Sequence, residues 1–240
     1  MRIIRCKDYD EMSAIAGKIM VDQVKEKPDS ILGLATGSTP IGMYKKMIEA
    51  YKNGEVSFKN VHTFNLDEYY KIEKTNDQSY YYFMNENLFS HIDIDKNNID
   101  IPNGQADDYQ AECERYEKAM EESAGIDIQV LGVGVNGHIG FNEPEELLYE
   151  KTHLTGLTQS TIEANSRFFD SIDLVPTSAL TMGMGSIMKA KKILVLISGK
   201  SKHDVVTKIL GDRMSTQTPV TLLKGHHDVT VIVDDEAYNG

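Results

Sequence analysis

Residues 128–144 of the chain have the sequence IQVLGVGVNGHIGFNEP. The apolar run 128–131 predicts a buried strand, and the glycine-rich residues that follow predict a loop. That loop carries an amide (Asn136), an imidazole (His138) and a carboxylate (Glu143). In open α/β sheets, loops at the carboxyl ends of strands bind ligands. The stretch therefore predicts a strand followed by a loop with proton-transfer groups. A structural turn with an exposed histidine is the alternative, and a lone Gly-x-Gly would favour it.

Strands and helices alternate on both sides of this stretch. Short apolar runs predict strands, and apolar residues at helical spacing predict helices. The predicted strands are 2–5, 30–35, 61–66, 127–133, 192–197 and 228–233, and the predicted helices are 8–25, 41–51, 79–89, 177–189 and 200–210. Continuously apolar strands are typical of a mostly parallel sheet that is covered on both faces. We expect an α/β fold with an open, mostly parallel sheet and helices on both faces, in a single domain (1–240) whose first strand lies at an edge.

Composition limits the partners and the compartment. The formal net charge is −12 at pH 7, which argues against a nucleic-acid partner, although a few local donors can still bind a small anion. Cys6 and Cys113 lie in no metal or redox motif, so we expect no disulfide framework and a reducing compartment. The sequence shows no signal-peptide pattern and no apolar run of membrane-spanning length. We expect a cytoplasmic protein without a membrane partner.

The sequence LATGSTP, residues 34–40, joins a predicted strand to a predicted helix. Gly37, Ser38 and Thr39 would offer backbone N–H groups and hydroxyls at a helix N-terminus, which is typical of a phosphate cradle. Pro40 suits the first helical turn, with Ser38 or Thr39 as the cap. No GK[ST] follows, so nucleoside triphosphate chemistry is not expected. An ordinary capped helix is the alternative.

Two adjacent carboxylates, Asp67 and Glu68, follow the predicted strand 61–66 in the sequence FNLDEYY. A carboxylate at this position can point into a ligand-binding cleft, whereas a solvated acidic turn is the alternative. Neighbouring residues at a strand end face opposite sides, so we expect only one of the two to be functional. The sequence does not rank them.

His138 and Glu143 form a candidate proton-shuttle pair, because a carboxylate can orient an imidazole and stabilise its charged form. Zinc is a weak alternative, since the two residues do not have HExxH spacing and no second ligand lies near. The sequence His226-His-Asp228 also looks like a metal motif, but it precedes a strand and is interpreted as a solvated turn.

Two basic residues could bind a phosphate at the carboxyl edge of the sheet. Arg167 lies in EANSRFF, and Lys202 follows the predicted strand 192–197 in SGKSK. For an isolated cation the alternative is an ordinary surface residue.

Taken together, LATGSTP, FNLDEY, GVGVNGHIGFNEP, ANSRFF and the Lys after ISG resemble the glucosamine-6-phosphate deaminase family (glucosamine/galactosamine-6-phosphate isomerases). The resemblance runs from about Ile31 to Lys202, with the motifs in order. The related 6-phosphogluconolactonases share a GxGxDGH-like loop but lack the FNEP continuation. The resemblance implies a Rossmann-like fold and a reaction without metal or cofactor, in which glucosamine 6-phosphate and water become fructose 6-phosphate and ammonia.

The resemblance also implies a role for each matching residue. Asp67 matches the base that moves a proton from C2 to C1 of the open sugar, and His138 matches the group that opens the ring. Asn136 and Glu143 match the partners of His138. The positions that match the phosphate site are Gly37, Ser38, Thr39, Arg167 and Lys202. Many members carry Asp at the position of Asn136, so here we expect Glu143 to supply the negative charge.

The resemblance leaves alternatives for function and assembly. A 6-phosphogluconolactonase-like hydrolase, a sugar-phosphate isomerase and a non-catalytic sugar-phosphate sensor are the alternatives to a deaminase. The allosteric hexamers of the family have a longer C-terminal tail and basic residues where this chain has His153 and Thr155. We therefore expect an enzyme without allosteric activation that is a monomer, with a homo-oligomer as the alternative.

Overall fold

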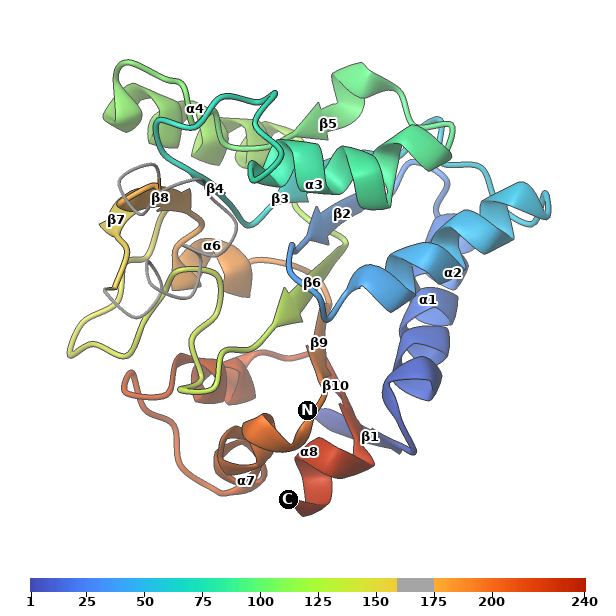
Figure 1. Cartoon of the computed structure of the whole chain (residues 1–240), viewed down its shortest axis with the longest axis vertical. Coiled ribbons are helices and arrows are strands. Elements are labelled where there is room, and N and C mark those ends of the chain that lie inside the picture. The colour runs from blue at the N-terminus through green and yellow to red at the C-terminus, as the bar shows by residue number, and fades with distance from the viewer. Residues whose placement is uncertain (159–174) are drawn as a thin grey trace.

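A seven-stranded sheet forms the centre of the computed structural model, which describes residues 1–158 and 175–240. Its strands are β1 (Arg2–Cys6), β2 (Ile31–Leu34), β3 (His62–Asn65), β5 (Ile99–Asp100), β6 (Ile128–Gly132), β9 (Ile193–Ile197) and β10 (Val229–Asp234). They lie in the order β1-β10-β9-β6-β2-β3-β5, and every neighbouring pair is parallel (Figure 1). The expected open parallel sheet is confirmed, with β1 at one edge.

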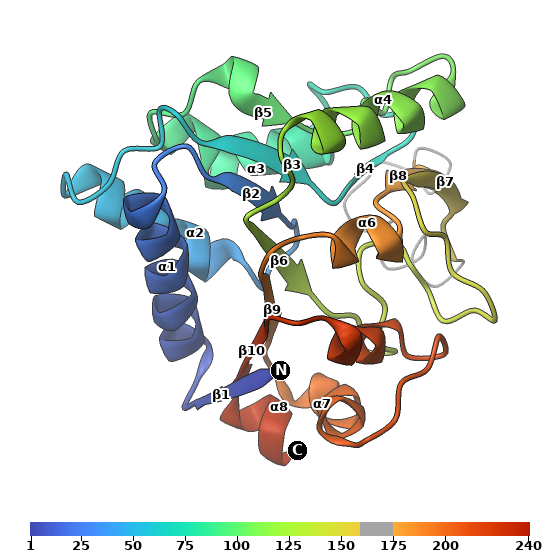
Figure 2. The ribbon, with the colours of Figure 1, turned by 180° about the vertical axis from the view of Figure 1, so that it is seen from behind.

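Helices cover both faces of this sheet. One face carries α1 (Tyr9–Glu26), α2 (Ile41–Lys52) and α3 (Tyr80–Asn87), and the other carries α4 (Tyr109–Glu122), α6 (Met184–Met188), α7 (His203–Leu210) and α8 (Asp235–Asn239). Figures 1 and 2 show the two layers from opposite sides. The strand β9 reads ILVLI, and alternate residues enter the two cores: Leu194 packs with the α1 side and Val195 with the α7 side. A strand buried on both faces must be apolar throughout, which is the pattern in the sequence.

Short 3-10 helices complete the connections. They are η1 (Phe89–His91), η2 (Lys96–Asn98), η4 (Lys200–Lys202) and η5 (Pro219–Gly225). The predicted helix 200–210 is thus a 3-10 turn that continues into α7. No helix in the described part of the chain is long and apolar enough to cross a membrane.

A second, smaller sheet was not predicted. It consists of β4 (Asp67–Tyr69), β8 (Ser178–Thr181) and β7 (His153–Gly156), in the antiparallel order β4-β8-β7. In its ladder Asp67 lies opposite Thr181. The small sheet therefore fixes the residue that follows β3 by pairing it with a segment more than a hundred residues away.

The prediction of one helix over 177–189 was wrong. The segment forms β8 and then α6, and Gly183 separates them. A Cβ at Gly183 would collide with the backbone of Glu150 and Lys151, so the chain turns here at close approach. The helix α4 was not predicted, because its buried apolar residues Cys113, Tyr116 and Met120 stand among many charged ones.

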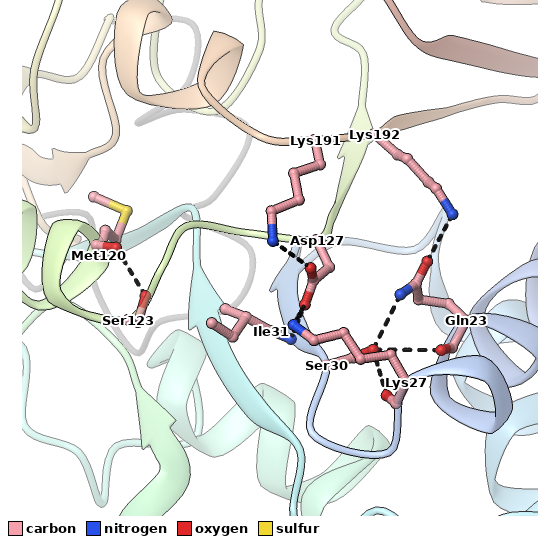
Figure 3. A network of polar contacts seen from close by, with 9 residues as sticks. All are labelled: Gln23, Lys27, Ser30, Ile31, Met120, Ser123, Asp127, Lys191 and Lys192. Atoms are coloured by element: carbon pink, nitrogen blue, oxygen red, sulfur yellow. Dashed lines mark hydrogen bonds and ion pairs between the residues drawn. The ribbon is translucent and has the colours of Figure 1, made fainter.

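The amino ends of β2, β6 and β9 are joined by one buried carboxylate, Asp127 (Figure 3). Its Oδ2 accepts hydrogen bonds from Lys27 Nζ at 2.6 Å and from the N–H of Ile31 at 2.8 Å, and its Oδ1 accepts one from Lys191 Nζ at 2.7 Å. Burial alone would raise the pKa of this carboxyl, but the two lysines and the N–H group outweigh it, and the pKa is lowered. Asp127 thus ties three neighbouring strands together in its charged form.

Candidate active site

A cavity of 730 Å³ opens at the carboxyl edge of the central sheet, opposite Asp127. The segments after β2, β3, β6 and β9 all contribute to its wall, as expected where parallel strands end together. Among its lining residues are Gly37, Ser38, Thr39, Asp67, Tyr80, His138, Phe141, Glu143 and Lys202. Asn136 does not line the cavity but is bonded to a residue that does. Arg167 lies outside the described residues.

The loop 35–39 forms one end of the cavity, directly before α2. Gly37 has φ +93°, a conformation that favours glycine. The expected Ser38 or Thr39 cap is not formed: Pro40 itself occupies the N-cap position, and no side chain caps the helix. Instead the Tyr9 hydroxyl of α1 accepts a hydrogen bond from the N–H of Gly42 at 2.8 Å and donates one to the carbonyl of Ser38 at 3.0 Å. Tyr9, which belongs to α1, thus accepts a hydrogen bond from the first turn of α2 in place of a local capping side chain.

Asp67 begins β4 and lines the cavity, although only 6% of it is exposed. Burial, together with the neighbouring charge of Glu68, raises the pKa of the Asp67 carboxyl to about 8. A Cβ at Gly140 would lie 3.3 Å from Oδ2 of Asp67 and 2.9 Å from Oγ1 of Thr181. The glycine leaves room for this carboxyl beside the 134–143 loop.

Glu68 does not line the cavity and has a different surrounding. Its Oε1 accepts hydrogen bonds from the N–H groups of Tyr69 and Tyr80, and its Oε2 accepts one from Tyr81, each at 2.9 Å. The two adjacent carboxylates therefore separate, as the geometry of a strand end predicts. Of the two, the structure places Asp67 at the cavity and Glu68 at the N-terminus of α3.

His138, Asn136 and Glu143 lie together in the loop after β6. Nδ1 of His138 is 3.2 Å from Oε1 of Glu143, and the Asn136 amide donates to Oε2 of Glu143 at 2.6 Å. The N–H of His138 donates to Oδ1 of Asn136 at 3.1 Å. Burial would raise the pKa of Glu143, but His138 and Asn136 outweigh it and lower the pKa. Glu143 is thus the negative partner of the ring, and Asn136 orients both groups.

Two glycines make this loop possible. A Cβ at Gly134 would collide with the His138 ring, so the ring packs against bare backbone. Gly137 has φ +89°, and its carbonyl accepts the N–H of Val220 at 2.9 Å. The loop is therefore held in place by the segment that follows α7.

Lys202 reaches the cavity from the turn after β9. Its Nζ donates to the carbonyl of Val133 at 2.6 Å, and partial desolvation lowers the pKa of the ammonium. The turn begins at Gly199, which has φ +91° and whose N–H donates to Asp234 at 3.1 Å. The side chain is a cation held next to the 132–135 backbone.

The sequence did not single out several residues of the site. Tyr80 lines the cavity and stacks on Phe141, with ring centroids 6.2 Å apart and an interplanar angle of 5°. Asn142 is buried and donates to the carbonyls of Ile139 and Met182, which joins the loop to β8. The tyrosine-rich start of α3 in the sequence was the only available signal for Tyr80.

The interpretation of residues 226–228 as a solvated turn was wrong for His226. This ring is buried, and its Nε2 lies 2.7 Å from the carbonyl of Ala190. His227 is exposed, as expected. The motif is a packed junction before β10 and not part of the cavity.

Comparison with known proteins shows the family of the chain. Residues 9–232 match the family model described as glucosamine-6-phosphate isomerases/6-phosphogluconolactonase. The chain belongs to this family. A glucosamine-6-phosphate deaminase of Thermoanaerobacter is 54% identical over 237 residues, which are 99% of this chain and 94% of that protein. One from Clostridium perfringens is also 54% identical, over 99% of this chain and 98% of that protein.

Solved structures of family members have the same fold as this chain. A monomeric glucosamine-6-phosphate deaminase superposes with a TM-score of 0.95 at 48% identity, covering 99% of this chain and 98% of that one. The 6-phosphogluconolactonase of Thermotoga maritima has a TM-score of 0.78 at 22% identity, covering 98% and 99%. The second likeness shows the shared fold alone, so it does not favour a lactonase.

Proposed function

We propose that this chain deaminates and isomerises glucosamine 6-phosphate, with water, to fructose 6-phosphate and ammonia. The observation that carries the proposal is one cavity lined by a buried carboxyl (Asp67), a histidine with a carboxylate partner (His138 and Glu143) and an anion cradle. The deaminases that match nearly the whole chain support it. A sugar-phosphate sensor would need the cradle but no buried carboxyl of raised pKa.

The first step opens the sugar ring. In our proposal His138 moves a proton from the anomeric hydroxyl to the ring oxygen, and Glu143 stabilises the charged imidazolium that forms on the way. The Asn136 amide supports this role without charge, because it contacts both Glu143 and the backbone of His138. An Asp at this position would add a second negative charge that the Glu143 carboxylate makes unnecessary.

The second step moves the double bond from C1, where it joins oxygen, to C2, where it joins nitrogen. Asp67 removes the C2 proton from the open chain and returns it to C1, while one proton of the substrate's ammonium group passes to O1, which leaves a C1 hydroxyl and an iminium at C2. Water adds to C2, and the nitrogen leaves as ammonia, so the carbonyl of fructose 6-phosphate remains. A carboxyl with a raised pKa is a stronger base for a carbon acid than an exposed aspartate, once it has lost its own proton.

The phosphate anchors the sugar for both steps. We place it at the backbone N–H groups and hydroxyls of Gly37, Ser38 and Thr39, with Lys202 as a cation. Arg167 is proposed for the same site from the sequence alone. Binding energy from this remote group would hold C1 and C2 against Asp67.

One assay tests the proposal. Ammonia release from glucosamine 6-phosphate is measured in the presence of a metal chelator, with Asp67→Asn as the inactive control. We expect turnover by the unsubstituted protein only. Hydrolysis of 6-phosphogluconolactone without ammonia release would replace the proposal with the lactonase alternative, and tight binding without turnover would replace it with the sensor.

We further propose a cytoplasmic monomer that acts as a single domain. The sugar-phosphate chemistry and the two free cysteines support the compartment. The structure with a TM-score of 0.95 belongs to a protein described as monomeric, which supports the monomer. The pairing of β1 with β10 brings both ends of the chain into one sheet and supports the single domain.

A further inference from the structure

Glu68 is buried, with 2% of it exposed, and its carboxylate connects β4 to the start of α3. Three backbone N–H groups donate to it: Tyr69 on its own strand, and Tyr80 and Tyr81 in the first turn of α3. Ser79, the N-cap of α3, accepts the N–H of Tyr82 at 3.0 Å. Between them, Glu68 and Ser79 satisfy the N–H groups that the first turn of a helix leaves free.

This contact fixes the relation between two walls of the cavity. Asp67 and Glu68 are neighbours in β4, and Tyr80 begins α3. Because Glu68 holds the N-terminus of α3 against β4, it sets the position of the Asp67 carboxyl relative to the Tyr80 ring. Gly104 also approaches this strand closely: a Cβ at that position would collide with the carbonyl of Tyr69 and lie 3.3 Å from Cγ of Glu68.

Resting on the proposed function, we propose that Glu68 is a positioning residue of the reaction. It locks β4 to the N-terminus of α3, so that Asp67 stands at the reacting carbons, and its negative charge keeps Asp67 a strong base. Glu68 does not touch substrate, since it is not part of the cavity wall.

The charges around the pair are few. Glu68 is faced by Asp67, by Lys74, which follows β4, and by α3 through its N–H groups and the Tyr80 hydroxyl. Asp67 is faced by Glu68 and by the hydroxyls of Tyr80 and Tyr116. Burial raises the pKa of Glu68 to about 6, against the pull of the three N–H groups, so the residue is charged at neutral pH. Removing that charge should lower the pKa of Asp67.

Two variants test the charge of Glu68 and the length of its side chain separately. Glu68→Gln keeps the shape and two of the bonds but removes the charge, and its amide group cannot accept from Tyr81. Glu68→Asp keeps the charge, but its side chain is too short to reach α3. The matched control is Glu112→Gln, a buried carboxylate that accepts the N–H of Asn103 and pairs with Arg115 away from the cavity.

The kinetic experiment measures kcat and KM for glucosamine 6-phosphate against pH. For Glu68→Gln we expect the acid limb of kcat/KM to move to lower pH, because Asp67 loses its proton more easily, and kcat to fall about tenfold. For Glu68→Asp we expect the acid limb to stay and kcat to fall on the order of 100-fold, because the base is misplaced. KM should change little in both, and Glu112→Gln should match the unsubstituted protein.

A second measurement does not depend on activity. Amide hydrogen exchange should be faster at Tyr81 in Glu68→Gln and at both Tyr80 and Tyr81 in Glu68→Asp, whereas exchange in α1 and β9 should be unchanged. If the unsubstituted protein releases no ammonia, the proposed function fails, whereas the exchange data still decide whether Glu68 holds α3. A Glu68→Gln protein with unchanged kcat, acid limb and amide exchange would overturn the inference.

Discussion

Asp67 and Asp127 lie beyond opposite ends of the parallel strands of the central sheet, Asp67 after β3 and Asp127 before β6, and have similar exposed fractions of 6% and 5%. At the amino edge, Asp127 accepts from two lysines and a backbone N–H, and its pKa is lowered. At the carboxyl edge, burial and then the charge of Glu68 raise the pKa of Asp67 to about 8. The exposed fraction therefore does not distinguish the two residues.

The groups that contact each carboxyl account for the opposite shifts of the two pKa values. A buried carboxylate with cationic and N–H partners is stable as an anion and contributes to folding, whereas one without them is costly as an anion and reactive as a base. The amino edge thus holds strands together, and in the proposed mechanism the carboxyl edge keeps Asp67 ready for proton transfer. Substitutions at the two edges should accordingly have opposite effects on stability and activity.

The largest expected effect is on turnover. Asp67→Asn keeps the shape of the side chain but cannot accept a proton, so kcat should fall by roughly 10²–10⁴-fold while substrate binding survives. Steady-state ammonia release and equilibrium binding measure the two quantities. Asp127→Asn is the matched control, and its folded fraction should retain normal kcat. Near-normal turnover in Asp67→Asn would show that the comparison assigns the wrong carboxyl.

The same Asp67→Asn substitution should stabilise the protein at neutral and alkaline pH. The folded-state pKa of Asp67 lies above its unfolded value of about 4, so its contribution to stability is complete below pH 4 and is lost as the pH rises toward 8. Asparagine removes this loss, which amounts to roughly 1.4 kcal/mol for each pH unit in that window. Urea unfolding at pH 5 and pH 8 measures it. Equal stability of the two proteins at pH 8 would contradict a raised pKa.

Asp127→Asn, in contrast, should destabilise the protein. Loss of the charge leaves Lys27 and Lys191 without their partner and weakens the tie between β2, β6 and β9, so the free energy of unfolding should fall by roughly 2–4 kcal/mol. Because the pKa of Asp127 is lowered, its contribution is present above pH 4 and disappears as the pH falls through the folded-state pKa. Unfolding curves at pH 3 and pH 7 measure this. Asp22→Asn, which breaks an exposed pair with Lys18, should have little effect.

Substitutions in the phosphate site should change binding more than stability. Lys202→Ala and Arg167→Ala should each weaken the binding of glucosamine 6-phosphate by roughly 1.5–3 kcal/mol, the range for hydrogen bonds to charged groups. Glucosamine without phosphate should be a very poor substrate for the unsubstituted protein. Competition by inorganic phosphate reports on the same site. Equal activity on glucosamine would disprove the cradle.

The smallest expected effect is at Tyr9. Tyr9→Phe removes the hydroxyl that bonds Gly42 and Ser38, so the cradle loop should be less well fixed and KM should rise by a factor that corresponds to about 1 kcal/mol. The value of kcat should not change. Tyr51→Phe, at the other end of α2, is the control. A fall in kcat with constant KM would show that Tyr9 acts on the chemistry and not on phosphate binding.

The sequence determined the parts of this protein that depend on local pattern. Short apolar runs such as 193–197 predicted strands buried on both faces, and the order of strands, glycines and polar residues marked the loops that line the cavity. The motif after β6 brought His138, Asn136 and Glu143 within a few residues, so their contact needed no long-range information.

Tertiary structure decided what depends on distant partners. The β4-β8-β7 sheet, the choice of Asp67 over Glu68 for the cavity, and the Tyr9 contact at α2 all join segments that are far apart in the chain. The pKa of a carboxyl follows the same rule, because its surroundings come from the fold. Asp127 pairs with Lys27, 100 residues before it, and with Lys191, 64 residues after it. Asp67 is desolvated by the fold and has the neighbouring charge of Glu68, and no local pattern around either residue records that difference.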